Sequence, residues 1–376
     1  MKKRLTLCLC ICIMTSFGFI KGIDRMKRVC VLGAGAFGTA FASLLADNGF
    51  EVTIWCYESF VVDDITQKRC NETFLPGVKL SENIKPFTNM AYALEDAGWV
   101  FEAIPVKFLR SILQKAKPYV TDEQRWVVLS KGIENGTLLF PSQVIDDVFE
   151  KKMKKAVVAG PSFAKNIACK QMTGVDIACE DLDMLAQLQR MLENDYFKCH
   201  MTSDIIGVQV GGSLKNILAI ATGMLDGAGY PDNTKAFLLT EGLHEMALFA
   251  EHVGADAQTL YGLSGVGDLV LTCMGGLSRN LMVGKHLGKG ETLDAILKRT
   301  GVVPEGANTV KSVYQIITRE SKDVPKFELQ DFGAHIGQGK KVVMQGGKIN
   351  MPIFESMYEI LYGGKTVEYL LKVLKA

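Results

Sequence analysis

The fold of this chain is decided by a stretch close to its start, which reads Val29-Cys30-Val31-Leu32-Gly33-Ala34-Gly35-Ala36-Phe37-Gly38. The apolar, β-branched run at its beginning predicts a strand. The three glycines then have the spacing G-x-G-x-x-G, and an apolar helical pattern follows over residues 37–48. In this context the first glycine makes a tight turn, the second admits a pyrophosphate, and the third lets the helix pack on the strand. We therefore predict a dinucleotide-binding turn, although an ordinary glycine-rich turn between strand and helix has the same local pattern.

The chain around this turn alternates between short apolar runs and amphipathic stretches. Strands are predicted over residues 29–32, 52–55, 99–104, 126–130, 157–159 and 175–179. Helical patterns lie between several of these strands, for example over residues 107–117. Such alternation is typical of a parallel sheet that carries helices on both faces. Residues 26–203 are therefore predicted to form an α/β domain of the Rossmann type that binds NAD or NADP.

The strand signal fades after about residue 204, and long helical patterns replace it. These patterns cover residues 204–225, 234–253, 280–287, 293–299, 309–320 and 353–362. Glycine-rich joints separate them, as expected between packed helices. Residues 204–376 are therefore predicted to form a second, all-helical domain that binds the substrate and contributes catalytic groups.

The first 25 residues conflict with the rest of the chain. Lys2, Lys3 and Arg4 precede an apolar run over residues 5–20, as in a secretory signal. This run is short for a membrane span, and Met26 stands close to the first predicted strand. We therefore predict that residues 1–25 are an over-extended start and that translation begins at Met26. The mature chain is then expected to be cytoplasmic, without a membrane span.

The overall composition argues against several classes of protein. The 376 residues carry a net charge of +1, without the basic surplus that a nucleic-acid-binding protein usually has. The ten cysteines form no C-x-x-C pair, which suits free thiols in a reducing compartment. The five histidines have no metal-ligand spacing. We predict neither a nucleic-acid partner nor a metal site.

The residues after the second predicted strand bear on the choice of cofactor. That strand is followed by Cys56-Tyr57-Glu58. A carboxylate at this place can accept a hydrogen bond from the ribose 2′-hydroxyl of NAD, whereas an arginine would suit the 2′-phosphate of NADP. Glu58 has no adjacent arginine, although Lys68 and Arg69 follow further on. The pattern slightly favours NAD and leaves NADP open.

Two other predicted strands end in polar residues. One is followed by Ser130-Lys131-Gly132 and the other by Gly160-Pro161-Ser162. Ligands of an open α/β sheet bind beyond the carboxyl ends of its strands. Lys131 could hold a substrate oxygen or the carboxamide of a nicotinamide there, or it could be a surface lysine in a turn. Ser162 could cap a helix, or it could help to present N–H groups to an anionic substrate.

The most unusual charge in the helical part is Lys215, within an apolar run over residues 208–220. Burying an ammonium without a partner is costly, and burial lowers the pKa of a lysine toward neutrality. Gly211 and Gly212 precede it and leave room for another backbone or a ligand. Lys215 is therefore either a proton-transfer group or a lysine that extends from a core helix to solvent.

Two polar clusters follow in the predicted helical domain. Asp268 ends the glycine-rich run Ser264-Gly265-Val266-Gly267-Asp268, and Ser278-Arg279-Asn280 begins ten residues later. Arginine is the preferred fork for a phosphate or carboxylate, and serine and asparagine add neutral hydrogen bonds. Taken alone, Asp268 could cap a helix and Arg279 could form a surface ion pair. Together with a buried lysine, they would complete a carbonyl-reduction site beside a nicotinamide.

These motifs occur together, and in this order, in one known family. The matching runs are Gly33-Ala34-Gly35-Ala36-Phe37-Gly38-Thr39-Ala40, Ser130-Lys131-Gly132-Ile133-Glu134, Ala159-Gly160-Pro161-Ser162-Phe163-Ala164, Gly207-Val208-Gln209-Val210-Gly211-Gly212-Ser213-Leu214-Lys215-Asn216, Gly265-Val266-Gly267-Asp268-Leu269-Val270-Leu271-Thr272-Cys273 and Ser278-Arg279-Asn280. From Met26 to its C-terminus the chain resembles the bacterial NAD(P)-dependent glycerol-3-phosphate dehydrogenases. The resemblance implies a Rossmann-type domain joined to an all-helical domain, an architecture similar to that of 6-phosphogluconate dehydrogenase.

The resemblance also implies a reaction and the residues that carry it. The expected reaction is the reversible, NAD(P)H-dependent reduction of dihydroxyacetone phosphate to sn-glycerol 3-phosphate, the backbone of glycerophospholipids. Lys215 would transfer the proton, Asp268 would orient Lys215, and Lys131 would stabilise charge at the carbonyl oxygen. The substrate would contact Lys131, Gly160, Ser162, Lys215, Asp268, Ser278, Arg279 and Asn280. The cofactor would contact Gly33, Gly35, Ala36, Phe37, Gly38, Tyr57, Lys131, Ala164, Arg279, Val303 and Glu305.

The resemblance has two departures, and two other functions fit the motifs less well. Glu241 stands where the family usually carries arginine, and Pro304 interrupts a segment that usually reads Val-Val-Glu-Gly. Both bear on cofactor fit or on the contacts of the expected homodimer. A β-hydroxyacid dehydrogenase of related architecture would instead take a carboxylate substrate. A nucleotide-sensing or membrane-tethered binding protein would bind NAD(H) without turning it over.

Overall fold

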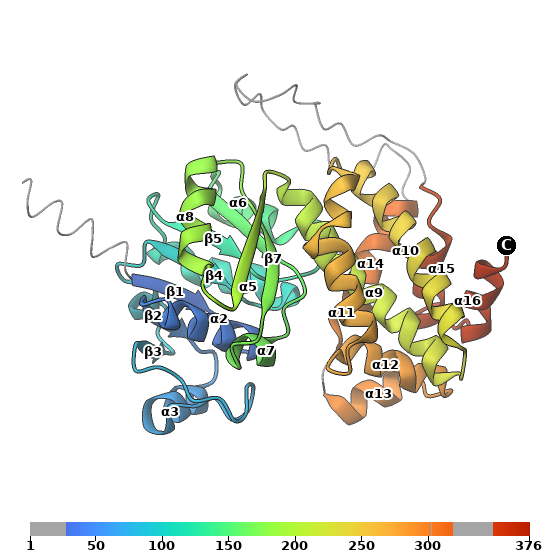
Figure 1. Cartoon of the computed structure of the whole chain (residues 1–376), viewed down its shortest axis with the longest axis horizontal. Coiled ribbons are helices and arrows are strands. Elements are labelled where there is room, and N and C mark those ends of the chain that lie inside the picture. Colours follow the sequence, from blue (N-terminus) through green and yellow to red (C-terminus); the bar gives the residue numbers. More distant parts are fainter. Residues whose placement is uncertain (1–27, 302, 319–348) are drawn as a thin grey trace, which may run out of the picture.

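The computed structural model describes residues 28–301, 303–318 and 349–376. They form an α/β domain followed by a helical domain, and the two lie side by side in Figure 1. The fold class predicted from the sequence is therefore confirmed. The predicted leader, residues 1–25, lies outside the described residues, as do the last two residues of the helix predicted over 309–320.

A single sheet organises the first domain. In the described part of the chain it has eight strands in the order β3-β2-β1-β4-β5-β6-β7-β8. They are β1 (Arg28–Leu32), β2 (Glu51–Trp55), β3 (Ile84–Phe87), β4 (Trp99–Glu102), β5 (Arg125–Val128), β6 (Lys154–Ala159), β7 (Thr173–Ala178) and β8 (Phe197–Thr202). β1 pairs with β2 on one side and with β4 on the other. The winding of the chain therefore reverses at β1, which is where such sheets bind ligands.

The sheet departs from the prediction at one strand pair and at its two edges. β7 runs antiparallel to β6, whereas the sequence predicted a parallel sheet. Only the five-residue helix α7 (Ala164–Ala168) lies between these strands, which is too short for the usual helical crossover between parallel strands. The edge strands β3 and β8 were not predicted from the sequence. β3 contains Pro86, which an edge strand tolerates, and β8 alternates with the polar residues Lys198 and His200.

Helices cover both faces of the sheet and create two hydrophobic layers. They are α2 (Ala36–Asp47), α3 (Ser59–Lys68), α4 (Met90–Leu94), α5 (Val106–Ala116), η1 (Lys117–Tyr119), α6 (Pro141–Phe149), α7 and α8 (Leu182–Leu192). Alternate residues of β1 point to opposite faces, as strand geometry requires. Val31 packs in the layer that contains Phe41 of α2, and Leu32 packs in the layer that contains Leu109 of α5.

The second domain is built around one buried helix, α9 (Ile205–Gly227). Around it lie α10 (Asp232–His252), η2 (Ala257–Tyr261), the π-turn η3 (Leu263–Gly267), α11 (Asp268–Met274), α12 (Arg279–Gly288), α13 (Leu293–Thr300), α14 (Glu305–Thr318), α15 (Pro352–Leu361) and α16 (Val367–Leu374). α9 is long and apolar enough to cross a membrane, but 89% of its most apolar window is buried inside the protein. α9 is therefore the core helix of this domain.

Glycines bring α12 into backbone contact with α9. A Cβ atom at Gly223 would lie 2.2 Å from the carbonyl oxygen of Leu281. One at Gly284 would lie 2.1 Å from the carbonyl oxygen of Ile220. No side chain fits at these distances, so the two helices cross with only glycine between their backbones. This contact fixes the N-terminus of α12, which carries Ser278-Arg279-Asn280, relative to Lys215 on α9.

Candidate active site

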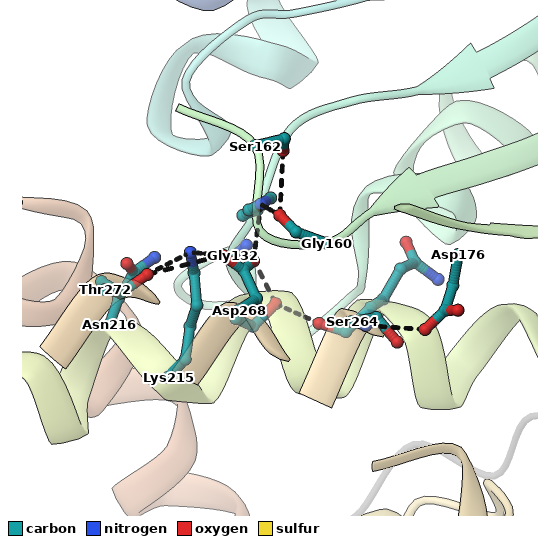
Figure 2. A network of polar contacts seen from close by, with 12 residues as sticks. Gly132, Gly160, Ser162, Asp176, Lys215, Asn216, Ser264, Asp268 and Thr272 are labelled. Atoms are coloured by element: carbon teal, nitrogen blue, oxygen red, sulfur yellow. Dashed lines mark hydrogen bonds and ion pairs between the residues drawn. The ribbon is translucent and has the colours of Figure 1, made fainter. Parts of the chain in front are cut away.

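Lys215 lies on α9 with its side chain 8% exposed. Its Nζ atom donates hydrogen bonds to Asp268 Oδ1 at 2.5 Å and to Thr272 Oγ1 at 2.7 Å. Figure 2 shows the side chain pointing from α9 toward both residues. The alternative of a core lysine that extends to solvent does not hold, because the ammonium ends at a buried carboxylate.

The glycine-rich segments on either side of this pair allow the helices to approach. A Cβ atom at Gly211 would lie 2.4 Å from the carbonyl oxygen of Ser264, so η3 packs directly on the backbone of α9. Asp176 of β7 accepts a hydrogen bond from the Ser264 amide at 2.6 Å and ties η3 to the sheet (Figure 2). Asp268 follows η3 as the first residue of α11 and faces α9, with its side chain 1% exposed.

Lys131 reaches the same carboxylate from the first domain. It follows β5, and its Nζ atom lies 2.7 Å from Asp268 Oδ2. The same atom is 3.4 Å from the Gly160 carbonyl oxygen and 5.9 Å from the centre of the Phe37 ring. Lys131 is therefore not a surface lysine in a turn. It joins the glycine-rich turn of the sheet to the buried pair of the helical domain.

The electrostatics of the cluster favour a lysine that exchanges its proton near neutral pH. Burial lowers the pKa of Lys215 to about 8, Asp268 raises it, and the charge of Lys131 lowers it further. Two ammonium groups share one carboxylate, so the cluster carries a net positive charge when both lysines are protonated. Such a site attracts an anionic substrate and stabilises negative charge on a reacting oxygen.

The polar trio at the start of α12 contacts α9 at the residue after Lys215. Asn280 Nδ2 donates to Asn216 Oδ1 at 3.0 Å, and Asn216 follows Lys215 directly. Ser278 caps α12, because its Oγ atom accepts from the Leu281 amide at 3.2 Å. Arg279 is exposed at the first position of the helix. An exposed arginine at a helix N-terminus suits the binding of an anion.

The glycine-rich turn has the geometry that a dinucleotide needs. Gly33 has a φ of 109°, and a Cβ atom at Gly38 would lie 1.9 Å from the Gly33 carbonyl oxygen. These two glycines are therefore required by the turn and by the packing of helix on strand. A Cβ atom at Gly35 would meet no protein atom within 4 Å, so packing does not explain this glycine. Open space at this position suits the close approach of a pyrophosphate.

The remaining candidate cofactor residues lie on several elements of both domains. Ala36 and Phe37 begin α2, Ala164 begins α7, and Tyr57 follows β2 with 70% of its surface exposed. Val303 and Glu305 lie at the start of α14. Burial raises the pKa of the Glu305 carboxyl to about 7, although the charges of Arg279 and Lys107 lower it. A Cβ atom at Gly132 would lie 3.5 Å from Glu305 Oε2, so this carboxyl lies beside the loop that carries Lys131.

Comparison with known proteins assigns the chain to a family. The sequence profile of the N-terminal part of NAD-dependent glycerol-3-phosphate dehydrogenase matches residues 28–185, and that of the C-terminal part matches residues 204–331. The chain belongs to the NAD-dependent glycerol-3-phosphate dehydrogenase family. The resemblance inferred from the motifs is thereby confirmed, and so is an NAD(P)-dependent oxidoreductase with glycerol-3-phosphate dehydrogenase activity.

Relatives and solved structures agree with this assignment over nearly the whole chain. A glycerol-3-phosphate dehydrogenase [NAD(P)+] of Bacillus pumilus is 38% identical over 93% of this chain and 94% of its own length. That of Bacillus subtilis is 37% identical over the same shares. The crystal structure of glycerol-3-phosphate dehydrogenase from Coxiella burnetii covers 93% of this chain and 99% of its own, with a TM-score of 0.82 and 29% identity.

The interpretation of the sequence missed two polar residues of the candidate site. Thr272 accepts from Lys215 Nζ and lies one helical turn after Asp268, but this i, i+4 spacing has a meaning only once α11 is known to be a helix. Asn216 bonds Asn280 and adjoins Lys215, but its neighbours on α9 are apolar and their pattern predicts only a core helix. Neither residue could be placed in the site without the arrangement of α9, α11 and α12.

The alternative interpretation of Ser162 as a helix cap was wrong. Ser162 is not a helix cap, because α7 begins at Ala164 after Phe163. The Ser162 Oγ atom instead donates to the Gly160 carbonyl oxygen at 2.9 Å, as Figure 2 shows. A Cβ atom at Gly160 would lie 2.7 Å from the Cα atom of Val175, so β7 holds this turn tightly. Gly160 and Ser162 therefore lie beside Lys131, within the group of predicted substrate residues.

Proposed function

We propose that the cluster of Lys215, Asp268 and Lys131 performs the reversible reduction of dihydroxyacetone phosphate to sn-glycerol 3-phosphate. Bound NAD(P)H supplies the hydride to C2 of the substrate. Lys215 donates a proton to the oxygen on C2 and takes it back in the reverse direction. Asp268 orients Lys215, and Lys131 stabilises the negative charge that develops on the same oxygen. The observation that carries this proposal is the shared carboxylate, with oxygens 2.5 Å from Lys215 Nζ and 2.7 Å from Lys131 Nζ.

The phosphate end of the substrate is assigned to the N-terminus of α12. Ser278, Arg279 and Asn280 lie there, and Asn280 is tied to Asn216 beside Lys215. An arginine and free helical N–H groups suit a dianionic phosphate. Gripping this end would hold C2 near Lys215, and such positioning supplies a large part of the rate in reactions of this kind. Gly160 and Ser162 complete the substrate side from the first domain.

The cofactor is assigned to the glycine-rich turn of the first domain. Gly33, Gly35 and Gly38 would hold the pyrophosphate, with Ala36 and Phe37 in the first turn of α2. Tyr57, Lys131, Ala164, Arg279, Val303 and Glu305 would complete the contacts. Glu58 follows β2 as the residue before α3, where it can accept from a ribose 2′-hydroxyl. This placement supports the preference for NAD, and the ratio of kcat/KM for NADH and NADPH measures it.

The proposed phosphate grip is tested with a substrate that lacks the phosphate. Replacing Arg279 by alanine removes a charge-assisted hydrogen bond of about 1.5–3 kcal/mol. The KM for dihydroxyacetone phosphate should rise about 10- to 100-fold, since each 1.4 kcal/mol is a factor of ten. At saturating NADH, which offsets any loss of the contact between Arg279 and the cofactor, turnover of dihydroxyacetone, followed as NADH oxidation, should not change. Equal losses with both substrates would contradict the assignment of Arg279.

A panel of carbonyl substrates tests the substrate class itself. NADH oxidation is measured with dihydroxyacetone phosphate and with a set of 2-keto and 3-keto acids. The proposal predicts turnover of the triose phosphate alone. Efficient turnover of a carboxylate substrate would instead favour the β-hydroxyacid dehydrogenase alternative.

The proposal extends to the organisation of the whole chain. We assign residues 26–203 to cofactor binding and residues 204–376 to substrate binding and proton transfer. The active form is expected to be a cytoplasmic homodimer. Sedimentation of the purified enzyme measures the number of subunits.

A further inference from the structure

The loop between α3 and β3 contains a buried polar residue that the proposed mechanism does not use. Asn71 is 1% exposed and lies just after α3, far in sequence from the glycine-rich turn. The loop around it is held by its own backbone, since the Leu75 amide donates to the Asn71 carbonyl oxygen at 2.8 Å. Leu75 and Leu80 anchor the loop in the hydrophobic layer beside α2. Asn71 is thus presented on a fixed support.

The side-chain amide of Asn71 is directed at the glycine-rich turn. Its Nδ2 atom donates to the Ala34 carbonyl oxygen and to Thr39 Oγ1, both at 2.8 Å. Thr39 Oγ1 in turn donates to the Ala34 carbonyl oxygen at 3.2 Å. The Oδ1 atom of Asn71 accepts from the Phe74 amide at 3.2 Å, so the orientation of the amide group is fixed. The Ala34 carbonyl oxygen therefore has two side-chain donors.

Fixing the Ala34 carbonyl also fixes the N–H group on the opposite side of the same peptide bond. A peptide group is planar and trans, so the carbonyl of Ala34 and the N–H of Gly35 point in opposite directions. Asn71 holds the carbonyl side from within the protein. The Gly35 amide donates to no residue in the described part of the chain, and a Cβ atom at Gly35 would meet nothing within 4 Å. The N–H of Gly35 thus faces the open side of the turn.

We propose that Asn71 is a positioning residue for the dinucleotide, because it fixes the peptide between Ala34 and Gly35 with the Gly35 N–H directed at the pyrophosphate. Asn71 itself does not touch the cofactor. A preoriented N–H group binds an anion without the cost of ordering the turn when the cofactor arrives. The inference rests on the assignment of the pyrophosphate to this turn and adds a residue from a loop outside the G-x-G-x-x-G run.

The test compares two substitutions of Asn71 with one of a matched asparagine, Asn48, at the C-terminal end of α2. Asn71→Ala removes both donors, and Asn71→Asp keeps the shape but places a carboxylate against the Ala34 carbonyl oxygen. Asn48 is the control: it ends α2 on the side away from the turn, and its Nδ2 atom also donates to two carbonyl oxygens, those of Met191 and Leu192. Binding of NADH is measured by fluorescence titration of the full-length protein, together with Tm.

The proposal predicts a loss of cofactor affinity that is separate from the loss of stability. Removing the shorter of the two hydrogen bonds to the Ala34 carbonyl oxygen should raise the Kd for NADH about tenfold in Asn71→Ala. Asn71→Asp should raise it more, whereas Asn48→Ala should lower Tm without changing the Kd. The KM for dihydroxyacetone phosphate at saturating NADH should stay within twofold of the wild-type value in all three variants.

Two results would overturn the inference. The first is an unchanged Kd for NADH in both Asn71 variants when the wild type binds normally. The second is an equal change in Asn48→Ala, which would mean that any weakening of α2 lowers the affinity. Failure of the wild type to bind NADH would instead contradict the assignment of the cofactor to this turn.

Discussion

At the scale of single residues, one carboxylate decides the chemistry of the site. Asp268 is buried and its two oxygens bind two different lysines, Lys215 and Lys131. Each lysine alone would be an unfavourable charge in the interior, and each is held by the same partner. The difference between them is exposure, since the side chain of Lys215 is 8% exposed and that of Lys131 is 18% exposed. Burial therefore lowers the pKa of Lys215, which suits it to proton transfer.

The pKa of Lys215 predicts how the rate depends on pH. Reduction of the ketone needs the protonated lysine, and its pKa is lowered to about 8. The kcat/KM for dihydroxyacetone phosphate should therefore fall as the pH rises above about 8. The kcat/KM for oxidation of sn-glycerol 3-phosphate should rise over the same range, because that direction needs the neutral amine. Initial rates from pH 6 to 10, at saturating cofactor, measure the pH dependence of kcat/KM in both directions. The range above about pH 8, where the rate of reduction decreases, is called the falling limb.

Replacing Asp268 by asparagine tests whether the decrease of the reduction rate at high pH reports the deprotonation of Lys215. The carboxylate raises the pKa of Lys215, so its removal should move the falling limb of the reduction rate to lower pH. Lys235, which pairs with Asp226 at 2.8 Å on the surface of the helical domain, provides the control. Asp226→Asn should leave the limb where it is. A limb that stays in place in Asp268→Asn would mean that another group titrates there.

At the scale of secondary-structure elements, glycines set the distance between α9 and its neighbours. The contacts at Gly223 and Gly284 join α9 to α12, and Gly211 joins α9 to η3. In the sequence, the glycines around Asp268 look like those of a loop, and α11 was not predicted for that reason. The structure gives them another role, because a Cβ atom at Gly265 would lie 2.0 Å from the Leu260 carbonyl oxygen. In a single sequence, glycines that allow close packing cannot be distinguished from glycines of a flexible loop.

An alanine at Gly284 tests whether this packing is essential. The added methyl group would meet the Ile220 carbonyl oxygen at 2.1 Å, and backbone cannot move aside as a side chain can. Overpacking of this kind costs about 1–3 kcal/mol in the free energy of unfolding. Gly276 is the matched control, because a Cβ atom there meets nothing within 4 Å and its φ is not positive.

Urea denaturation of the two variants measures the difference. Gly284→Ala should unfold at a clearly lower urea concentration than the wild type, and Gly276→Ala should unfold close to it. Equal midpoints for the two variants would show that α9 and α12 can separate at little cost.

At the scale of the whole molecule, the site exists only where the two domains meet. Lys131 comes from the end of β5, whereas Lys215 and Asp268 come from α9 and α11. The sheet brings the cofactor turn to the same edge, because Gly33 follows β1 and the strand ends of a parallel sheet lie together. The ion pair between Lys131 and Asp268 is thus both a contact between the domains and a part of the proposed site.

Much of this arrangement could be predicted from the sequence, and the remainder depends on contacts between distant segments. The glycine spacing after β1 and the lysine in an apolar run are local patterns. The first correctly predicted a turn between a strand and a helix, and the second correctly predicted a buried helix. The edge strands β3 and β8 were missed because they are less apolar than the interior strands. Thr272 and Asn71 were missed because their partners are distant in the chain: Thr272 bonds Lys215 and Asn71 bonds Ala34.

Replacing Lys215 by methionine is the most direct test of the central claim, which is that Lys215 transfers the proton. Methionine has nearly the length of lysine without its charge, and Asp268 would keep Lys131 as its partner. The kcat for dihydroxyacetone phosphate should fall about 10²- to 10⁴-fold, the usual contribution of a general acid. The Kd for NADH should not change, and Lys235→Met should keep full activity. A Lys215→Met enzyme that retains the wild-type kcat would contradict the account.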